Sequence, residues 1–174
     1  MSKKILYTEE QIAKRISQLA KEITRDYHQK PLVLIGLLKG AFIVIADLLR
    51  ALYQEGYTDI EVSFVTLKSY HASMSVSQEV SLITESDIAV KGRHVLLIDD
   101  IFDTGKSFVF AQEYMKKQGA LSVAGFVLLS KPERHEVSYR PQYVGFEVPD
   151  KWIEGYGMDS AEKGRGNPQI VYET

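Results

Sequence analysis

Short apolar runs recur along the chain and predict the strands of a buried sheet. Continuous apolar stretches bounded by Gly, Pro or polar residues are typical of strands covered on both faces. They occupy residues 32–35, 62–67, 95–98 and 125–129. Strands of this kind usually run parallel, because the connections between them pass over the faces of the sheet.

The segments between these runs carry helical patterns. Apolar residues at helical spacing over residues 12–23 follow Thr8 and Gln11, which have the spacing of a capping box, so an amphipathic first helix is expected. Residues 41–53 are apolar on most faces, and a further helix from about residue 107 ends near Gly119. The alternation predicts an α/β fold with a central, mostly parallel sheet flanked by helices.

Two other segments do not fit this alternation. Residues 69–86 are rich in Ser and Thr with weak apolar patterning, which predicts a mobile loop or an exposed hairpin. From about Tyr143 the chain is rich in Gly and aromatic residues. We therefore expect residues 143–174, together with the N-terminal segment, to form a small hood over the C-terminal edge of the sheet. A length of 174 residues suits one domain over 1–174.

Charge and composition exclude several classes of function. The formal net charge of −2 lacks the basic surplus that nucleic-acid binding needs. The chain has no Cys, which excludes disulfides and thiolate sites. No apolar run approaches the roughly 20 residues of a membrane helix, and no signal segment precedes Glu9. We therefore expect a cytoplasmic protein with neither nucleic-acid nor membrane partners.

An acidic cluster follows the apolar run at residues 95–98. Asp99, Asp100 and Asp103 come within five residues, and 104–107 then open the next predicted helix. Ligands of open α/β sheets bind at the carboxyl ends of strands, and the amides of a helix N-terminus bind phosphate. Carboxylates beside a phosphate call for a hard divalent cation, so a Mg²⁺ and sugar-phosphate site is predicted. The alternative is a solvated acidic turn that caps the helix.

Two nucleotide-binding motifs are incomplete. A Walker A loop ending at Gly105-Lys106-Ser107 needs Gly at position 100, which is Asp100. A dinucleotide fingerprint starting at Gly155 fails because its last position is Ser160. The sequence therefore argues against a P-loop NTPase and against a dinucleotide-binding protein.

A second candidate anion loop, Leu38-Lys39-Gly40, follows the first strand run, where the alternative is an ordinary strand-to-helix turn. Two anion loops favour a ligand with two phosphate groups. Lys131 follows the run at 125–129 and so also stands at a strand end, although a lone lysine there is more often simply solvated.

The segment 95–107, Val-Leu-Leu-Ile-Asp-Asp-Ile-Phe-Asp-Thr-Gly-Lys-Ser, resembles the phosphoribosyl pyrophosphate motif of type I phosphoribosyltransferases. The resemblance implies that Asp99 and Asp100 contact the ribose hydroxyls and the metal shell. It further implies that the 5-phosphate is bound by Asp103, Thr104, Gly105, Lys106 and Ser107.

Further motifs, in family order, resemble those of the hypoxanthine-guanine phosphoribosyltransferases, and the match spans about residues 35–165. In that family Leu38-Lys39-Gly40 is the pyrophosphate loop with a cis bond between Leu38 and Lys39, and Ser69-Tyr70 lies in a loop that closes over the reaction centre. The remaining implied roles are base recognition by Lys131, stacking by Trp152, backbone pairing by Ile153, metal binding by Asp159 and pyrophosphate binding by Arg165.

The resemblance implies salvage of hypoxanthine or guanine, with Asp103 as general base, Mg²⁺ as cofactor and a purine nucleotide as product. It also implies a homodimer or homotetramer. A xanthine-preferring or pyrimidine transferase and a non-catalytic nucleotide-binding regulator remain alternatives. The chain departs from the family pattern at Asp99, where Glu is common, at Phe102, and in the absence of aromatics over 160–167.

Overall fold

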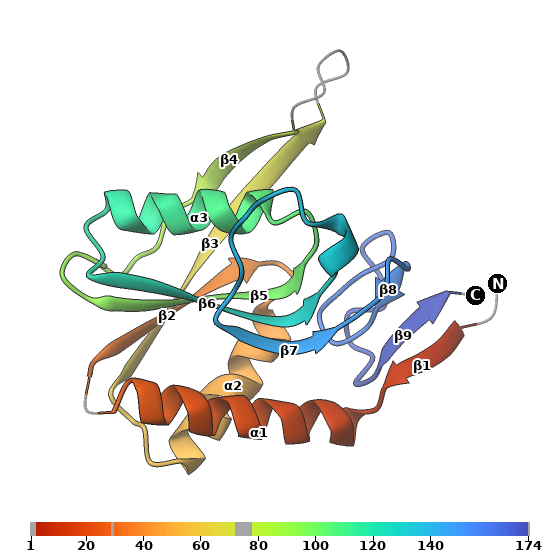
Figure 1. Cartoon of the computed structure of the whole chain (residues 1–174), viewed down its shortest axis with the longest axis horizontal. Helices are drawn as coiled ribbons and strands as arrows, with labels where there is room; N and C mark the ends of the chain where they lie inside the picture. Colours follow the sequence, from red (N-terminus) through yellow and green to blue (C-terminus); the bar gives the residue numbers. More distant parts are fainter. Residues whose placement is uncertain (1–2, 29, 72–77, 174) are drawn as a thin grey trace.

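The computed structural model describes residues 3–28, 30–71 and 78–173, and its main body is a six-stranded sheet (Figure 1). The strand order is β4-β3-β2-β5-β6-β7, and only β4 runs antiparallel to its neighbour. The strands are β2 Leu32–Leu38, β3 Ile60–His71, β4 Gln78–Thr84, β5 His94–Phe102, β6 Ser122–Ser130 and β7 Tyr143–Glu147. The prediction of a central, mostly parallel sheet is confirmed.

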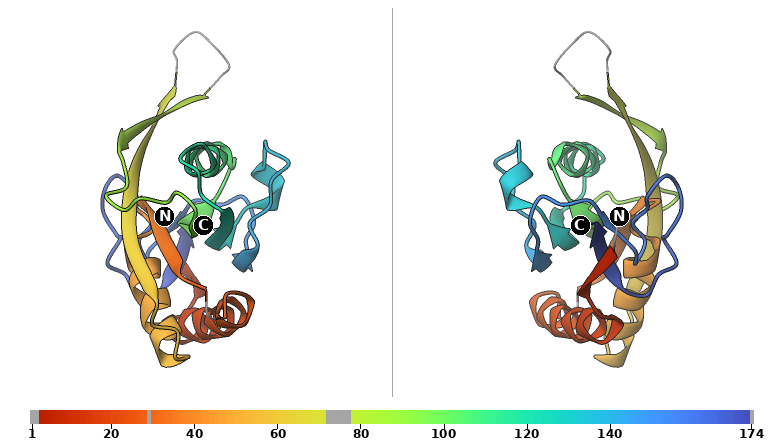
Figure 2. Two further views of the ribbon diagram at one scale, coloured as in Figure 1. Left: turned by 90° about the vertical axis from the view of Figure 1, so that its left-hand side faces the viewer. Right: turned by 90° about the vertical axis from the view of Figure 1, so that its right-hand side faces the viewer.

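Helices cover both faces of this sheet. Helices α1 (Glu9–Asp26) and α2 (Phe42–Gln54) lie on one face and α3 (Lys106–Lys117) on the other, as Figures 1 and 2 show. Leu34 of β2 packs into the core on the α1 and α2 side, whereas its neighbour Ile35 packs into the core beneath α3. Because side chains alternate across a strand, burial on both faces explains why the strand runs are apolar without interruption.

The helices begin and end close to where the sequence placed them. The Thr8 hydroxyl accepts a hydrogen bond from the Gln11 backbone amide at 3.3 Å, and the Thr8 backbone amide donates one to Oε1 of Gln11 at 2.9 Å, so the predicted capping box is present. Beyond α3, Gly119 has a φ of +85°, which suits the residue that ends a helix. Within the described ranges, no helix is both long and apolar enough to cross a bilayer.

A small second sheet forms the hood. It contains β1 (Lys3–Tyr7), β9 (Ile170–Glu173) and β8 (Ile153–Glu154), all antiparallel, and it brings the two ends of the described chain together. The predicted hood boundary at Tyr143 was wrong, because β7 pairs with β6 as the edge strand of the main sheet. The Tyr7 ring stacks on Phe146 of β7 with centroids 3.9 Å apart, which packs the hood against that edge.

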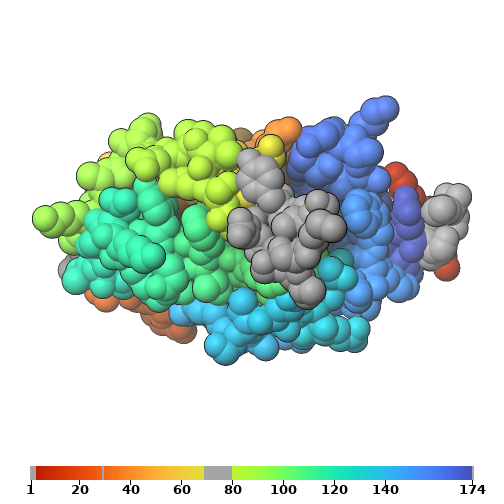
Figure 3. Space-filling view, turned by 90° about the horizontal axis from the view of Figure 1, so that it is seen from above, coloured from red at the N-terminus to blue at the C-terminus, as the bar shows by residue number. Residues whose placement is uncertain are grey.

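Strands β3 and β4 form a hairpin at the other edge. Of the two alternatives predicted for 69–86, a mobile loop or an exposed hairpin, the antiparallel pairing of β3 with β4 supports the hairpin, and 72–77 lie outside the described residues. The backbones of Ser69 and Tyr70 pair with Val80 and Glu79, while the side chains of Ser69 and Tyr70 also lie outside the description. Viewed from this end, α3 and the hood stand on opposite sides of the molecule (Figure 3).

Candidate active site

Three cavities meet at the carboxyl ends of β2, β5 and β6, and Asp100 lines all of them. Their volumes are about 390, 180 and 160 Å³. We call them the loop cavity, the hood cavity and the anion cavity. The loop cavity lies beside Lys39 and Arg165, the hood cavity beside Lys131 and Trp152, and the anion cavity beside Thr104, Gly105 and Ser107. One residue on the central strand thus joins three parts of a single site.

The loop cavity is lined by opposite charges from two distant segments. The Leu38-Lys39 peptide is cis, as the sequence resemblance implied. The Lys39 ammonium lies 3.0 Å from Glu162, and Arg165 lies 2.6 Å from Asp159. Hydrogen bonding to Lys39 and then to Arg165 lowers the pKa of Glu162 below its ordinary value. These two cations give the cavity groups that can bind a pyrophosphate.

Gly40 brings this loop into direct contact with the acidic strand. A Cβ atom at Gly40 would lie only 1.9 Å from Oδ2 of Asp100. That separation is far shorter than any real contact of this kind, so the loop can take this position only because residue 40 has no side chain.

Asp99 and Asp100 lie within β5, and the sequence had wrongly placed them in a loop after the strand. Pairing of β5 with β6 continues to Phe102, which extends the strand past both acids. Burial raises the pKa of Asp99 well above its ordinary value, and repulsion from Asp100 adds to it. Burial also raises the pKa of Asp100. A cation beside the two carboxylates would relieve this repulsion and desolvation.

Asp99 and Asp100 fit a divalent ion whose remaining coordination positions are filled mainly by substrate oxygens and water. Among the described residues no group of three or more metal-ligating side chains comes together. Mg²⁺ is commonly held by one or two carboxylates while substrate oxygens and water complete its shell. Asp99 and Asp100 supply such a partial set, and Asp159 lines the same loop cavity.

The anion cavity is formed by the turn between β5 and α3. Gly105 has a φ of +84°, and its backbone packs against Phe102, so glycine suits this position for both reasons. Thr104, Gly105 and Ser107 line the cavity at the start of α3. The Lys106 ammonium is instead ion-paired with Glu136, so the structure does not bring this predicted side chain to the cavity.

The hood cavity holds the groups predicted to read a base. Lys131 is only 8% exposed, and its ammonium donates to the Lys151 carbonyl at 2.8 Å and lies 3.7 Å from Asp150. Trp152 is 59% exposed, which excludes a role as a buried core residue. Ile153 and Asp103 also line this cavity.

Sequence reasoning missed two charged residues of the site. Arg134 donates to Asp103 and lies 3.4 Å from Asp150, so it links the predicted general base to the segment beside Lys131. Glu162 pairs with both Lys39 and Arg165. The strand-end argument that selected Lys131 also covers Arg134, three residues further on, whereas no local pattern indicates Glu162.

The chain belongs to the phosphoribosyl transferase family, because residues 2–161 match the model of the phosphoribosyl transferase domain. A hypoxanthine-guanine phosphoribosyltransferase from Aquifex aeolicus is 42% identical over 96% of this chain and 92% of its own length. A protein of the same description from Bacillus subtilis is 37% identical, over 98% and 96%. The crystal structure of a hypoxanthine phosphoribosyltransferase from Staphylococcus aureus superposes with a TM-score of 0.92 at 32% identity, covering 98% of this chain and 91% of that one.

Proposed function

We propose that this protein transfers the 5-phosphoribosyl group of phosphoribosyl pyrophosphate to hypoxanthine or guanine, which gives IMP or GMP and pyrophosphate. The observation that carries this proposal is the position of Asp100 in the wall of all three cavities. Pyrophosphate in the loop cavity, the 5-phosphate in the anion cavity and the base in the hood cavity would place the ribose at that point. The descriptions of the relatives support the same substrates.

Lys131 is the group that would select an oxopurine. A lysine ammonium has three donors and no acceptor, and one of its donors is already directed to the Lys151 carbonyl at 2.8 Å. A remaining donor suits the exocyclic oxygen of hypoxanthine or guanine. The amino group of adenine is itself a donor and would leave Lys131 without a partner, which is the kind of mismatch that discriminates strongly.

Trp152 and Ile153 would hold the base in place while Lys131 reads it. The exposed Trp152 ring lies in the cavity wall, where a purine can stack on it. The buried Ile153 begins β8, so its backbone is fixed by the hood sheet and can pair with the edge of the base.

In the proposed reaction, ring nitrogen 9 of the base bonds to the anomeric carbon as the bond from that carbon to the pyrophosphate oxygen breaks. Asp103 accepts the proton that the purine ring releases at nitrogen 7, and Arg134 holds the Asp103 carboxylate in place. Lys39 and Arg165 stabilise the negative charge that accumulates on pyrophosphate. Bound Mg²⁺, held at Asp99 and Asp100 with Asp159 nearby, would neutralise charge on the phosphates.

The remaining expectations from the sequence stay predictions. A homodimer or homotetramer is supported by Phe42 and Tyr53 of α2, which are 43% and 70% exposed. Closure of Ser69 and Tyr70 over the site is supported by the position of their strand beside β2, whose carboxyl end opens into the loop cavity.

Release of pyrophosphate tests the proposed function. The protein is incubated with phosphoribosyl pyrophosphate and Mg²⁺, and hypoxanthine, guanine, xanthine, adenine and uracil are offered separately. We expect release with hypoxanthine or guanine and none with adenine. Absence of release with every base would favour a non-catalytic regulator of the same fold.

In the same assay Asp103→Asn should lower turnover by about 10²-fold, the usual contribution of a general base.

A further inference from the structure

The hood packs directly onto the pyrophosphate loop. A Cβ atom at Gly157 would lie 2.2 Å from the carbonyl oxygen of Gly40, so these two backbones are in close contact. Gly40 in turn lies against the Asp100 carboxylate. The hood segment therefore contacts the pyrophosphate loop, and that loop contacts β5. A shift of the hood would move the loop and so change the loop cavity.

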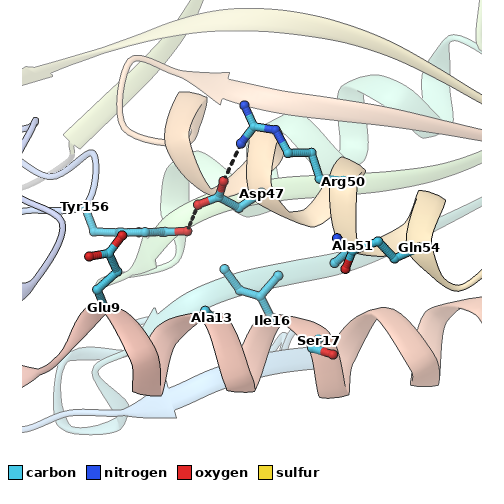
Figure 4. Close-up of a pocket in the computed structure, with 9 residues that line it drawn as sticks. All are labelled: Glu9, Ala13, Ile16, Ser17, Asp47, Arg50, Ala51, Gln54 and Tyr156. Atoms are coloured by element: carbon cyan, nitrogen blue, oxygen red, sulfur yellow. Dashed lines mark hydrogen bonds and ion pairs between the residues drawn. The ribbon is translucent and has the colours of Figure 1, made fainter.

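Tyr156 connects the same hood segment to helix α2. Its side chain is buried, with 5% of the residue exposed, and its hydroxyl donates a hydrogen bond to Oδ2 of Asp47 (Figure 4). The other Asp47 oxygen accepts a hydrogen bond from Arg50 at 2.7 Å. Burial and the Asp47 carboxylate both raise the pKa of Tyr156, so the hydroxyl keeps its proton and acts as the donor.

Because Asp47 lies on α2, its hydrogen bond to Tyr156 links the hood to the helix that follows the pyrophosphate loop. Helix α2 begins at Phe42, immediately after the Lys39-Gly40 loop, so the helix that carries the loop also holds the hood. Tyr156 itself has a φ of +49°, a region that residues with a side chain rarely adopt. A backbone of this kind persists only when surrounding contacts hold it, and the Asp47 hydrogen bond is one such contact.

We propose that Tyr156 is a positioning residue, whose hydrogen bond to Asp47 fixes the hood on α2 and so sets the geometry in which Lys39 and Arg165 bind pyrophosphate. The inference rests on the proposed function of the loop cavity. Arg165 is coupled to the hood segment directly, because it donates to the Gly157 carbonyl at 2.8 Å. Loss of the Tyr156 hydroxyl should therefore weaken ligands that carry a pyrophosphate group more than it slows the chemical step.

A cavity of about 280 Å³ between α1 and α2 allows this to be tested without unfolding the protein. Tyr156, Asp47 and Arg50 line it, and the Asp47 side chain is 38% exposed. Water can therefore reach the Asp47 carboxylate if the hydroxyl is removed. Tyr156→Phe accordingly leaves no buried unpaired charge, which would be the costly outcome.

The test compares Tyr156→Phe with a matched control, Tyr143→Phe. Tyr143 is also a buried tyrosine that donates to an aspartate, Asp26, at 2.9 Å, but it lies at the amino end of β7, away from the three cavities. For Tyr156→Phe we expect KM for phosphoribosyl pyrophosphate to rise about tenfold with a smaller change in kcat, the size of one lost hydrogen bond to a charged group. Tyr143→Phe should lower the unfolding midpoint and leave KM unchanged.

A double-mutant cycle then identifies the contact. Asp47→Ala should raise KM for phosphoribosyl pyrophosphate as much as Tyr156→Phe does, and the double variant should have a KM no higher than either single variant. Asp47→Asn keeps an acceptor for the Tyr156 hydroxyl, so its KM should be closer to the wild-type value than that of Asp47→Ala. A wild-type KM in Tyr156→Phe, an equal effect in Tyr143→Phe, or additive effects in the cycle would overturn the positioning role. An inactive wild-type protein would instead overturn the proposed function itself.

Discussion

At the scale of single residues, the close backbone contacts of glycines restrict which residues the site can accept more strictly than its charges do. Gly40 touches Asp100, and Gly157 touches Gly40, with no room for a Cβ atom at either glycine. Charged residues such as Lys39 and Glu162 lie in the same cavity, yet both side chains are 67% exposed and can move. The glycine contacts therefore fix the backbone against which the mobile charges act.

Gly40→Ala tests this limit. The new methyl group must displace the Asp100 carboxylate or the loop, and a misplacement of about 1 Å can cost on the order of 10²-fold in rate. We therefore expect kcat/KM for phosphoribosyl pyrophosphate to fall by about that factor. Gly166→Ala is the matched control, because a Cβ atom there meets nothing within 4 Å. Wild-type kinetics in Gly40→Ala would refute the account of this contact.

At the scale of elements, the short 3-10 helix Pro132–Arg134 connects Lys131, the residue proposed to recognise the base, to strand β5. It follows β6 and carries Arg134, while His135 at its end packs edge-on against Phe102 of β5 with ring centroids 4.8 Å apart. The His135 Nε2 atom lies 3.2 Å from the Ser130 hydroxyl. This packing holds the segment that contains Lys131 and Arg134 against β5.

Titration of His135 should make the stability of this segment depend on pH. Burial lowers the pKa of His135, and the nearby Arg140 lowers it further, which outweighs the opposing effects of hydrogen bonding to the Phe102 backbone and of the Asp103 and Glu147 carboxylates. A histidine with a lowered pKa in the folded state stabilises the fold above its unfolded pKa of about 6.5, and this contribution is lost as pH falls through the folded value.

The measurement is urea unfolding of wild type and His135→Gln between about pH 7.5 and pH 5, the range that spans histidine titration. We expect the stability advantage of the wild type to shrink as pH falls, because only the wild type must charge a partly buried imidazole. A difference that stays constant or grows toward low pH would contradict this interpretation.

The elements also show where sequence patterns stop being informative. Apolar runs predicted β2, β5 and β6, but acidic residues were taken as the end of β5, although backbone pairing with β6 extends it to Phe102. Strand β7 was assigned to the hood because the chain from about Tyr143 is rich in Gly and aromatic residues. Both errors arise because strand pairing depends on a neighbour that is distant in sequence.

At the scale of the whole molecule, the sequence predicted the parallel sheet from its apolar runs and the two anion loops from the residues that follow those runs. Both are local patterns. The sequence did not predict the contacts that join distant segments, such as Tyr156 to Asp47 or Arg134 to Asp150. These pairs carry no shared local pattern, because folding alone brings them together. The site is therefore predictable in its parts, whereas the links that hold the parts in register are visible only in the structure.

The fluorescence of Trp152, the only tryptophan of the chain, tests most directly the claim that the cavities form one nucleotide site. Trp152 lines the hood cavity, so a bound purine should stack on it and quench its emission, whereas ribose 5-phosphate should not. We predict that IMP or GMP quenches Trp152 and that ribose 5-phosphate, without quenching, competes with the nucleotide. Calorimetric binding of IMP with unchanged Trp152 emission would contradict the account.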